Sequence, residues 1–488
     1  MEITSSIFII LSILAVFAYY LMKQKHRVLF LTLLSCGFIA TYSHNLLLYV
    51  LAYTLVNYFI GIKIPDSKQK KLLFTIGLVF NLTQLILLRY ISFTIGPLFQ
   101  LLHISWDASI ISRFIIPVGV SYFTLQGIGY LININMGWEK PERNLLHFLL
   151  YISFFPRFIS GPIDRSNRFL PQLHEKQDFN KENLSEGFRL ILFGLVKKVV
   201  IANQLSAIVH GAFDPANATA GYNVLIAMLV QPLYLYFDFS GYTDIAIGVA
   251  RAFGITIPMN FNRPFMAQNM TNFWKRFHAS LSSWFNDYIF MRTMFKYRKW
   301  KQQATTFALF VTWILFGIWH GAGWTFMFLG VLQALAVYWE FRTKKWRYKV
   351  FSRLPSFYAT WLGRIFTYVF YSFSLTFFFA PDLRSAFSFV ARLPRSGGFL
   401  PVSLSDPKFL LVLVFILLVM VIETIQEDFS KVSSKLETGW SSQKWINVGF
   451  RWLIYYTMFV LIMMYNTQDV EFVYVQFQFF PSTTSIIN

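Results

Sequence analysis

The chain has 488 residues, of which 56% are hydrophobic, 19% aromatic and only 14% charged. Soluble domains usually carry about 25% charged residues, so this composition excludes an ordinary soluble domain and indicates a protein embedded in a membrane. The formal net charge of +20 does not indicate nucleic-acid binding, because the basic residues fall in short clusters between apolar segments.

Long apolar segments recur along the whole chain and predict an all-α, polytopic membrane protein. At about 20 residues per crossing they correspond to roughly 11 to 13 membrane-inserted helices. The longest polar stretch, Pro162 to Asn183, is too short to enclose its own core, so we expect a single membrane domain over residues 1–488. The apolar segments are 6–22, 28–61, 72–91, 113–133, 188–210, 222–237, 305–340, 358–379, 408–425 and 449–466.

The first apolar segment is expected to remain in the protein as an anchor. It follows MEITSS, which lacks a basic region, and no A-x-A cleavage site comes after it. Basic clusters at 23–27, 62–71, 292–302 and 342–353 predict one cytoplasmic face, because Lys and Arg are enriched in cytoplasmic loops. The N-terminus would then lie on the opposite side of the membrane.

Metal and redox chemistry have no signature in the sequence. A single cysteine, Cys36, excludes an intramolecular disulfide and a cysteine metal cluster, and the eight histidines show no HExxH pattern. We therefore expect no metal site and no tightly bound cofactor. No internal repeat is visible, which disfavours a transporter built from duplicated halves.

Two segments in the first half differ from ordinary lipid-facing helices. Val118 to Asn133, VGVSYFTLQGIGYLIN, combines apolar residues with three glycines, which predicts a helix packed closely against its neighbours. Phe154 to Arg165, FFPRFISGPIDR, contains two prolines and a glycine, so we expect a broken helix or a loop. At membrane depth such a segment is tolerated only where protein or a water-filled cavity satisfies its backbone.

The segment Tyr234 to Gly248, YLYFDFSGYTDIAIG, places two carboxylates in an apolar helical pattern. Intramembrane carboxylates are costly, so Asp238 and Asp244 are candidates for lining a polar cavity, with Tyr242 between them. Alternatively, one or both lie at the membrane interface and cap a helix. Because they are six residues apart, a regular helix would place them on different faces, which favours separate roles over a paired acid-base site.

From Trp274 to Tyr288, apolar residues recur with helical spacing and predict an amphipathic helix at the cytoplasmic surface. Lys275 and Arg276 belong to its polar side. His278 lies at the edge of the apolar face, where a packed, hydrogen-bonded histidine and a catalytic histidine are both consistent with the pattern.

The segment FGIWHGAGWTF, Phe316 to Phe326, raises the question of why a histidine stands in an apolar run. Residues 305–319 would form a helix of roughly 22 Å, shorter than the ~30 Å hydrocarbon core. The run 324–340 then leads back to a basic loop, so the pair is expected to be a helical hairpin. Its turn, which contains His320, would lie inside the bilayer.

In that turn, Gly321 and Gly323 permit a tight reversal and would leave space beside the imidazole of His320. A neutral histidine there can accept a proton from a hydroxyl and act as a general base. A hydrogen-bonded histidine that only ends a helix fits the same position, and the sequence leaves both interpretations open.

Six ordered segments carry a resemblance to a known family: VGVSYFTLQ, FFPRFISGPI, YFDFSGYTDIAIG, NFNRPF, FWKRFHASLSSWFNDY and WHGAGWTF. Together they resemble the membrane-bound O-acyltransferase (MBOAT) family, most closely its bacterial branch of alginate O-acetyltransferase-like and D-alanyltransferase-like proteins. The similarity runs from about Val118 to Glu340, with additional helices over 355–488, and a short match at Phe472 to Phe477, FVYVQF, adds to it. The resemblance implies a ring of tilted helices around a central cavity or tunnel.

In that family the histidine of the WHG segment is catalytic, which corresponds to His320, and a second histidine in the FW-x-x-x-H segment corresponds to His278. The resemblance implies that His320 deprotonates the acceptor hydroxyl. It implies that His278 positions the donor near the cytoplasmic mouth, where nearby cations would attract an anionic carrier. The candidates for substrate binding or for lining the cavity are Asp238, Tyr242, Asp244, Trp274, Lys275, Arg276 and Trp319.

Within this resemblance, some segments are similar to one enzyme type and other segments to a second type. FSGYTDIAIG, the chain length and the spans after Lys349 are similar to the polysaccharide O-acetyltransferase type. SGPIDR and NDYIFMR are similar to the D-alanyl type, and the Pro-Leu-Gly-Gly segment common after the DY pair in acetyltransferases is absent. Because length and tail organisation involve more of the chain, we favour acetyl transfer and keep D-alanyl transfer for teichoic-acid-type D-alanylation as the alternative.

The resemblance also implies substrates, partners and location. The donor would be a cytoplasmic acyl thioester, acetyl-CoA or an acyl carrier protein, and the acceptor an extracytoplasmic polysaccharide. The protein would be a multi-pass protein of the bacterial inner (plasma) membrane, in contact with membrane lipid, and would work with an SGNH-type acyltransferase partner. The competing classes are a transporter or flippase, in which Asp238 and His320 would relay protons, and a structural scaffold.

Overall fold

The structure is a computed structural model that describes residues 2–90, 102, 118–214, 219–395, 406–441 and 444–465. Within these ranges the chain is helical, and its one β-type pairing is an isolated antiparallel bridge between Phe261 and Phe277. Nine of the described helical segments are long and apolar enough to cross a membrane, which confirms the all-α, polytopic class. They are His44–Asp66, Lys70–Tyr90, Lys181–Phe213, Tyr222–Ala252, Gln302–His320, Trp324–Phe351, Ser356–Phe379, Pro407–Asp428 and Trp445–Tyr465.

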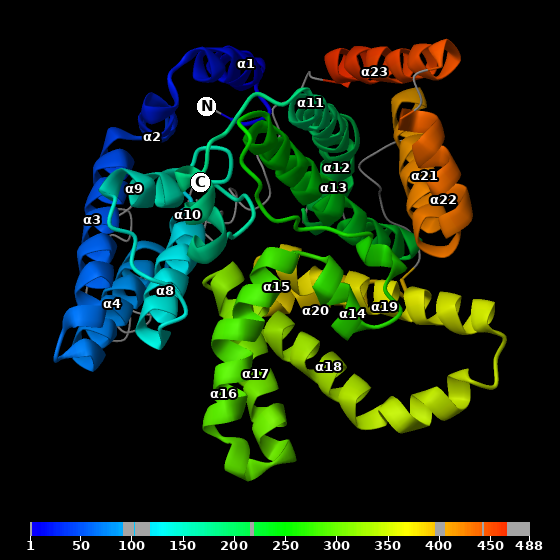
Figure 1. Cartoon of the computed structure of the whole chain (residues 1–488). Coiled ribbons are helices and arrows are strands. Elements are labelled where there is room, and N and C mark those ends of the chain that lie inside the picture. Colours follow the sequence, from blue (N-terminus) through cyan, green and yellow to red (C-terminus); the bar gives the residue numbers. More distant parts are fainter. Residues whose placement is uncertain are drawn as a thin grey trace.

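The first group contains the N-terminal helices, blue to cyan in Figure 1, and within it α3, α4, α9 and α10 contact α8. Helix α8 is buried on every face from Val120 to Ile134 and contacts α3 and α4. A Cβ atom added at Gly127 would lie 2.2 Å from the Tyr53 hydroxyl, so the glycine allows the close packing that the sequence predicts. The group consists of α1 (Ser6–Leu21), α2 (Gln24–Ala40), α3 (His44–Asp66), α4 (Lys70–Leu85), η1 (Ile86–Tyr90), α8 (Val120–Met136), α9 (Leu145–Ser153) and α10 (Ser166–His174).

The segment between α9 and α10 is not helical, as its prolines predict. It is nevertheless buried, and Arg157 within it is 1% exposed. The Arg157 guanidinium donates to the Tyr151 carbonyl oxygen at 2.6 Å and lies 4.2 Å from the Phe169 ring centroid. Asp164 lies 3.9 Å from the same guanidinium. The backbone of the segment also finds partners in the protein interior, since the Phe155 amide donates to the Ser35 hydroxyl at 3.2 Å and the Ile163 amide to the Ser280 hydroxyl at 3.0 Å.

The central group is an antiparallel pair in which α11 (Lys181–Leu195), η2 (Val196–Ala202) and α12 (Asn203–Phe213) run along α13 (Tyr222–Ala252). Two glycine pairs bring the backbones together. A Cβ atom at Gly187 would lie 2.6 Å from the Gly248 carbonyl oxygen, and one at Gly194 would lie 2.6 Å from the Gly241 carbonyl oxygen. Larger side chains at these positions would force the two helices apart.

The third group contains the helical hairpin α17–α18, and α18 also packs against α19. Figure 1 shows it in green to yellow below α11–α13. The group consists of η4 (Pro264–Met266), α14 (Met270–Arg276), α15 (Ala279–Phe285), η5 (Asn286–Phe290), α16 (Met291–Lys296), η6 (Arg298–Trp300), α17 (Gln302–His320), α18 (Trp324–Phe351), α19 (Ser356–Phe379) and α20 (Leu383–Ala391).

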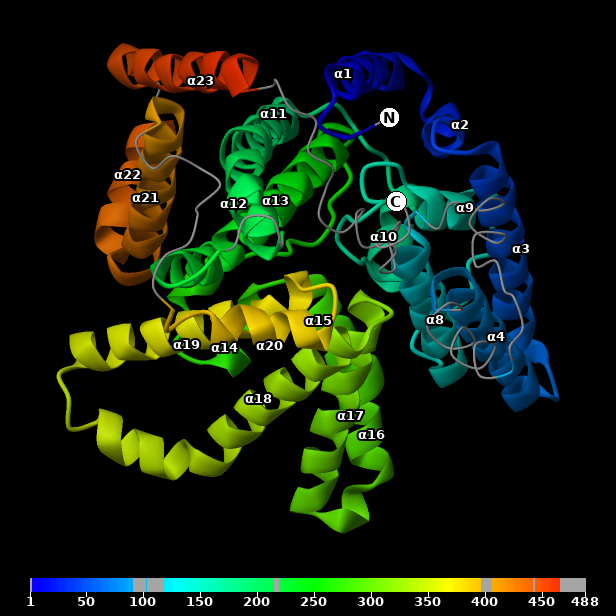
Figure 2. The ribbon, with the colours of Figure 1, turned by 180° about the vertical axis from the view of Figure 1, so that it is seen from behind.

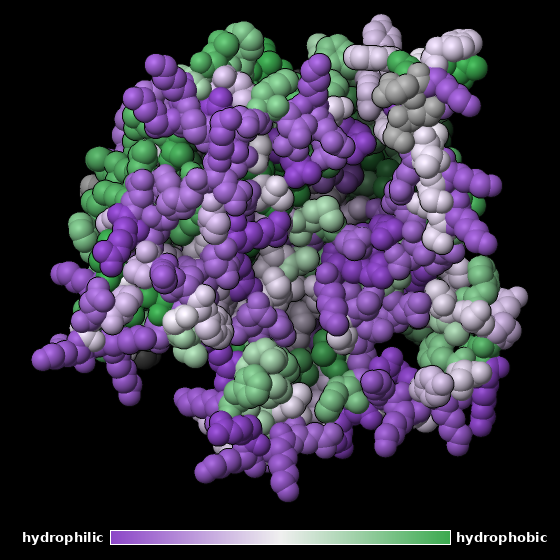
Figure 3. All heavy atoms as spheres, viewed as in Figure 1, coloured by the Kyte–Doolittle hydropathy of each residue, from purple (hydrophilic) through white to green (hydrophobic). Residues whose placement is uncertain are grey.

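Three further helices, α21 (Pro407–Asp428), α22 (Ser430–Ser441) and α23 (Trp445–Tyr465), stand at one edge of the molecule, orange to red in Figures 1 and 2. In the most apolar stretch of each helix, only 22% of α21 and 6% of α23 is buried inside the protein. Lipid is therefore the natural environment of their apolar faces. Figure 3 shows hydrophilic residues gathered across the middle of one face, with hydrophobic residues along the edge near α3 and α4. The FVYVQF segment, 472–477, lies outside the described residues.

Candidate active site

His320 is the last residue of α17, and α18 begins at Trp324, so the predicted helical hairpin is confirmed. Two glycines bring the helices together near the turn. A Cβ atom at Gly317 would lie 2.2 Å from the Phe326 carbonyl oxygen, and one at Gly330 would lie 2.4 Å from the Trp313 carbonyl oxygen. This contact fixes the end of α17 against α18.

The expected opening beside Gly321 is wrong. A Cβ atom there would lie 2.1 Å from Cε2 of Phe326, so an aromatic ring already fills that space. A Cβ atom at Gly323 would meet atoms no closer than 3.6 Å. The room next to His320 therefore lies on another side of its ring.

The carbonyl groups at the end of α17 are bonded to side chains from η1. The Tyr90 hydroxyl donates to the Ile318 carbonyl oxygen at 2.8 Å, and the Arg89 guanidinium donates to the His320 carbonyl oxygen at 2.6 Å. The last carbonyls of a helix lack partners within that helix, so these donors replace the missing bonds and fix its end. Sequence reasoning missed Arg89, although an arginine inside an apolar segment is a recognisable signal.

The ring of His320 is held in a defined orientation. Its Nδ1 lies 2.8 Å from the Phe316 carbonyl oxygen, and the residue is 6% exposed. A carbonyl oxygen only accepts hydrogen bonds, so Nδ1 carries the proton, and Nε2 of the neutral ring carries none. Rings of Phe316 and Trp319 pack beside it, with centroids 4.7 and 5.0 Å away.

His278 lies at a break between two short helices. The predicted single amphipathic helix from Trp274 to Tyr288 is wrong, because α14 ends at Arg276 and α15 begins at Ala279. His278 has a φ of +48°, in the left-handed region that L-residues other than glycine seldom adopt. The helical spacing of the apolar residues survives within each helix, but the chain changes direction between them.

The neighbouring segment 260–262 supplies the hydrogen bonds that hold this break. The Asn262 amide donates to the Arg276 carbonyl oxygen, and the Ala279 amide donates to the Asn260 carbonyl oxygen, both at 2.9 Å. The Ser280 hydroxyl donates to the Asn260 side-chain oxygen at 2.5 Å. These long-range partners outweigh the local preference for a continuous helix.

As a result, His278 is fully enclosed by protein, with 0% of the residue exposed. Its ring centroid is 6.5 Å from that of His320 and 4.6 Å from that of Phe239. Both histidines line one small cavity of about 20 Å³, which is room for about one water molecule. Two residues that the sequence separates thus belong to one site.

The remaining wall of this cavity is mostly apolar and comes from α13, α14, Phe277, α17, α18 and α19. Trp274 lines it, as predicted, and its indole Nε1 donates to the Gln333 side-chain oxygen at 3.2 Å. Gln333 in turn donates to the Ser374 hydroxyl at 2.9 Å. Sequence reasoning missed Gln333 and also Tyr371, a buried aromatic residue of α19.

Trp319 is buried against this site but is not among the residues that line the cavity. Its ring packs edge-to-face on Tyr122 and lies 6.1 Å from the His278 ring. Its indole Nε1 donates to the Ser121 carbonyl oxygen at 3.4 Å. Trp319 thereby connects α8 to the two histidines.

The two carboxylates of α13 bind lysines of η2 and do not line the histidine cavity. Asp238 accepts from the ammonium group of Lys198, and both side chains are almost fully buried. Asp244 accepts from Lys197 at 2.6 Å. The two carboxylates therefore have separate lysine partners, and Tyr242 between them is buried but does not line the same cavity.

Two cations were predicted to attract the donor. Lys275 is exposed, whereas Arg276 is partly buried and forms an ion pair within the protein. The Arg276 guanidinium donates to a carboxylate oxygen of Glu427 in α21 at 2.7 Å, and Arg263 lies 3.5 Å from the other carboxylate oxygen. This ion-pair group ties α14 to α21. It gives Arg276 a structural partner that the sequence did not predict.

Comparison with known proteins adds an independent line of evidence. The sequence model of the membrane-bound O-acyltransferase family matches residues 142–381. A probable alginate O-acetylase of Azotobacter vinelandii is 32% identical over 342 residues, which is 68% of this chain and 66% of the relative. The match to this alginate relative therefore spans slightly less than two thirds of the relative's own length.

Two other relatives act on different polymers by their names. A peptidoglycan O-acetyltransferase of Helicobacter pylori is 32% identical over 398 residues, covering 73% of this chain and 72% of the relative. A teichoic acid D-alanyltransferase of Bacillus subtilis is 32% identical over 271 residues, covering 54% of this chain and 68% of the relative. Together with the helical membrane architecture and the paired histidines, these matches show that the chain belongs to the membrane-bound O-acyltransferase family.

Proposed function

We propose that this protein transfers an acyl group, acetyl in particular, from a cytoplasmic thioester to a hydroxyl group, for O-acetylation of an extracytoplasmic polysaccharide. The observation that supports this most strongly is that His278 and His320 line the same buried cavity. One histidine can serve as base while the other contacts a reactant, and the surrounding apolar wall excludes bulk water.

His320 acts as the general base in this proposal. Its Nδ1 proton is used in the bond to the Phe316 carbonyl oxygen, so the unprotonated Nε2 can accept the proton of a hydroxyl group. As the proton leaves, the hydroxyl oxygen attacks the thioester carbon. A carbon–oxygen bond forms, the carbon–sulfur bond breaks, and the thiolate departs with the bonding electrons and takes the proton from Nε2 of His320, which returns the histidine to its neutral form.

His278 positions the donor in this scheme. Its backbone conformation is held by the 260–262 segment, so its ring has a fixed place on the cavity wall. The cavity of about 20 Å³ has room for one water molecule and not for a thioester. Donor entry therefore requires the side chains that line it to move.

The donor would be acetyl-CoA or an acyl carrier protein, and the protein would reside in the bacterial inner membrane. Two relatives with acetyltransferase names, for alginate and for peptidoglycan, support acetyl transfer. A periplasmic or extracellular SGNH-type partner would complete transfer to the polymer. D-alanyl transfer is the second candidate, and the match to the teichoic acid D-alanyltransferase supports it.

The test uses the full-length protein with Cys36 replaced by serine, purified in detergent and shown to be monodisperse. Thiol release from acetyl-CoA, from an acetylated carrier protein and from a D-alanylated carrier protein is followed with a thiol reagent, with and without a hydroxyl acceptor. We expect acceptor-dependent release from an acetyl donor. Faster release from the D-alanyl donor would replace acetyl by D-alanyl transfer, and no release from any donor would reject acyl transfer.

A further inference from the structure

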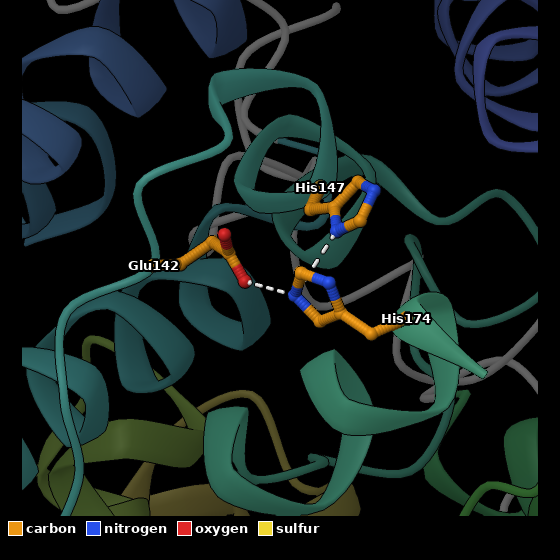
Figure 4. A group of neighbouring side chains, drawn as sticks. All are labelled: Glu142, His147 and His174. Atoms are coloured by element: carbon orange, nitrogen blue, oxygen red, sulfur yellow. Dashed lines mark hydrogen bonds and ion pairs between the residues drawn. The ribbon is translucent and has the colours of Figure 1, made fainter.

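Outside the histidine cavity, three side chains that can bind a transition metal converge between α9 and α10 (Figure 4). They are Glu142, His147 and His174, and one ligand atom from each lies within 4.8 Å of the others. Nδ1 of His147 lies 3.3 Å from Nε2 of His174, and that Nε2 lies 2.8 Å from Oε2 of Glu142. His147 is buried, whereas the His174 side chain is 54% exposed.

We infer that these three residues form a zinc site, with Nδ1 of His147, Nε2 of His174 and one carboxylate oxygen of Glu142 as ligands. Two imidazole nitrogens and one carboxylate oxygen are a donor set that zinc prefers. Ligands about 2.0–2.1 Å from a tetrahedral zinc ion lie about 3.3 Å apart, which matches the 3.3 Å between the two histidine nitrogens; the 2.8 Å between His174 and Glu142 would lengthen on binding. The exposed side of His174 leaves a fourth position open to water.

Hydrogen bonds can hold these three side chains without a cation only if the Nε2 proton of His174 is shared between the Glu142 carboxylate and Nδ1 of His147. An imidazole nitrogen carries either one proton or one lone pair in the plane of the ring. Nε2 of His174 therefore cannot donate to the Glu142 carboxylate and also accept a hydrogen bond from Nδ1 of His147. A cation among the three atoms interacts favourably with all of them at once.

The ligands are also held in place by surrounding groups. The Glu142 amide donates to the Tyr130 hydroxyl at 3.2 Å, and Oε1 of Glu142 accepts from the Asn144 amide at 2.8 Å, which directs Oε2 toward His174. The Asn144 side chain caps α9, the helix that carries His147, by accepting from the Leu146 amide at 2.9 Å. Such supporting hydrogen bonds orient metal ligands before the ion binds.

A metal ion at this point would join the loop before α9 to α9 and α10. It would thereby close the irregular segment 154–165, which lies between those two helices. Within that segment, the Ile163 amide donates to the Ser280 hydroxyl at 3.0 Å, and Ser280 belongs to the helix that follows His278. We therefore assign the zinc ion a structural role that is independent of the proposed transfer reaction.

The experiment measures metal in the full-length protein, purified in detergent, stripped with EDTA and then dialysed against a low concentration of zinc. Zinc per chain is determined by elemental mass spectrometry, and visible absorbance of the cobalt-loaded protein reports tetrahedral coordination. The variants are His174→Ala and Glu142→Gln, and the control is His26→Ala, which removes an exposed histidine elsewhere. His174 is largely exposed, so its replacement should leave the fold intact.

We expect about one zinc ion per chain in the parent protein and in the control, and at least about tenfold weaker binding in His174→Ala and Glu142→Gln. Zinc should also raise the Tm of the parent but not of His174→Ala, because an ion that binds only the folded state stabilises it. Equal zinc binding by the parent and His174→Ala would overturn the assignment, and so would less than about a tenth of an ion per parent chain.

Discussion

The imidazole rings of His278 and His320 lie 6.5 Å apart, centroid to centroid, although His278 lies at a break between two short helices and His320 ends a long helix. Both line the same small cavity. Their different surroundings lead to different expectations for the two residues. His320 has its Nδ1 bonded to a carbonyl oxygen, whereas His278 stands in a backbone conformation that its neighbours impose.

Replacing His320 by glutamine should lower the acylation rate about 10²–10⁴-fold, because removal of a positioned general base typically has that effect. Glutamine keeps hydrogen-bonding capacity and much of the volume but cannot accept the hydroxyl proton. The rate of thiol release by the purified variant is the measurement, and His44→Gln, at an exposed histidine, is the control. A near-parental rate would make His320 a structural residue and His278 the next base to test.

Replacing His278 by asparagine should raise the apparent KM for the donor and leave measurable turnover, since donor binding is weakened while the base remains. Asparagine is the appropriate change because it tolerates the left-handed conformation that a φ of +48° requires. His278→Ala, which tolerates it less well, should lower the Tm further than His278→Asn. Turnover as low as that of the His320 variant would reject this division of roles.

Replacing Gly330 by alanine should destabilise the hairpin by about 1–3 kcal/mol, the usual range for an overpacked site. The new methyl group would lie 2.4 Å from the Trp313 carbonyl oxygen, so α17 and α18 would have to separate. Gly37→Ala is the matched control, because no atom lies within 4 Å of a Cβ atom there. Thermal unfolding in detergent compares the two, and equal Tm values would contradict the close helix contact.

The buried pair Lys198 and Asp238 predicts a non-additive response. Removing one partner leaves an uncompensated buried charge and should cost about 3–5 kcal/mol, whereas Lys198→Met combined with Asp238→Leu should cost less than either single change. The exposed pair Lys176 and Asp178 is the control, and its loss should cost at most about 1 kcal/mol. Additive losses of stability at the buried pair would argue against a direct ion pair.

The basic clusters predict which loops face the cytoplasm. Single cysteines at Ser67 and Ser352, introduced into a chain in which Cys36 is serine, should resist an impermeant thiol reagent in intact cells. Both should react after the cells are opened, because Ser352 is exposed and Ser67 partly so. Ready labelling of both in intact cells would overturn this topology.

The sequence by itself determined the membrane class, the helical hairpin at His320 and the close packing of the helix that begins at Val120. These features depend on local properties: hydrophobic length, helical spacing, and the position of glycine and proline within a segment. The family resemblance identified His278 and His320 as catalytic candidates, because no local pattern distinguished them from histidines that only pack in the interior.

Only the tertiary structure decided where His278 lies, because Asn260 accepts hydrogen bonds from Ala279 and Ser280, and Asn262 donates one to Arg276; these bonds break a helix that its own residues favour. It also paired Arg276 with Glu427, and it brought His174 to Glu142 and His147, although the sequence predicts no metal site. Such contacts join residues far apart in the chain, and their energy depends on packing and desolvation in the folded protein. Local periodicity carries no record of them, so the sequence alone could not supply them.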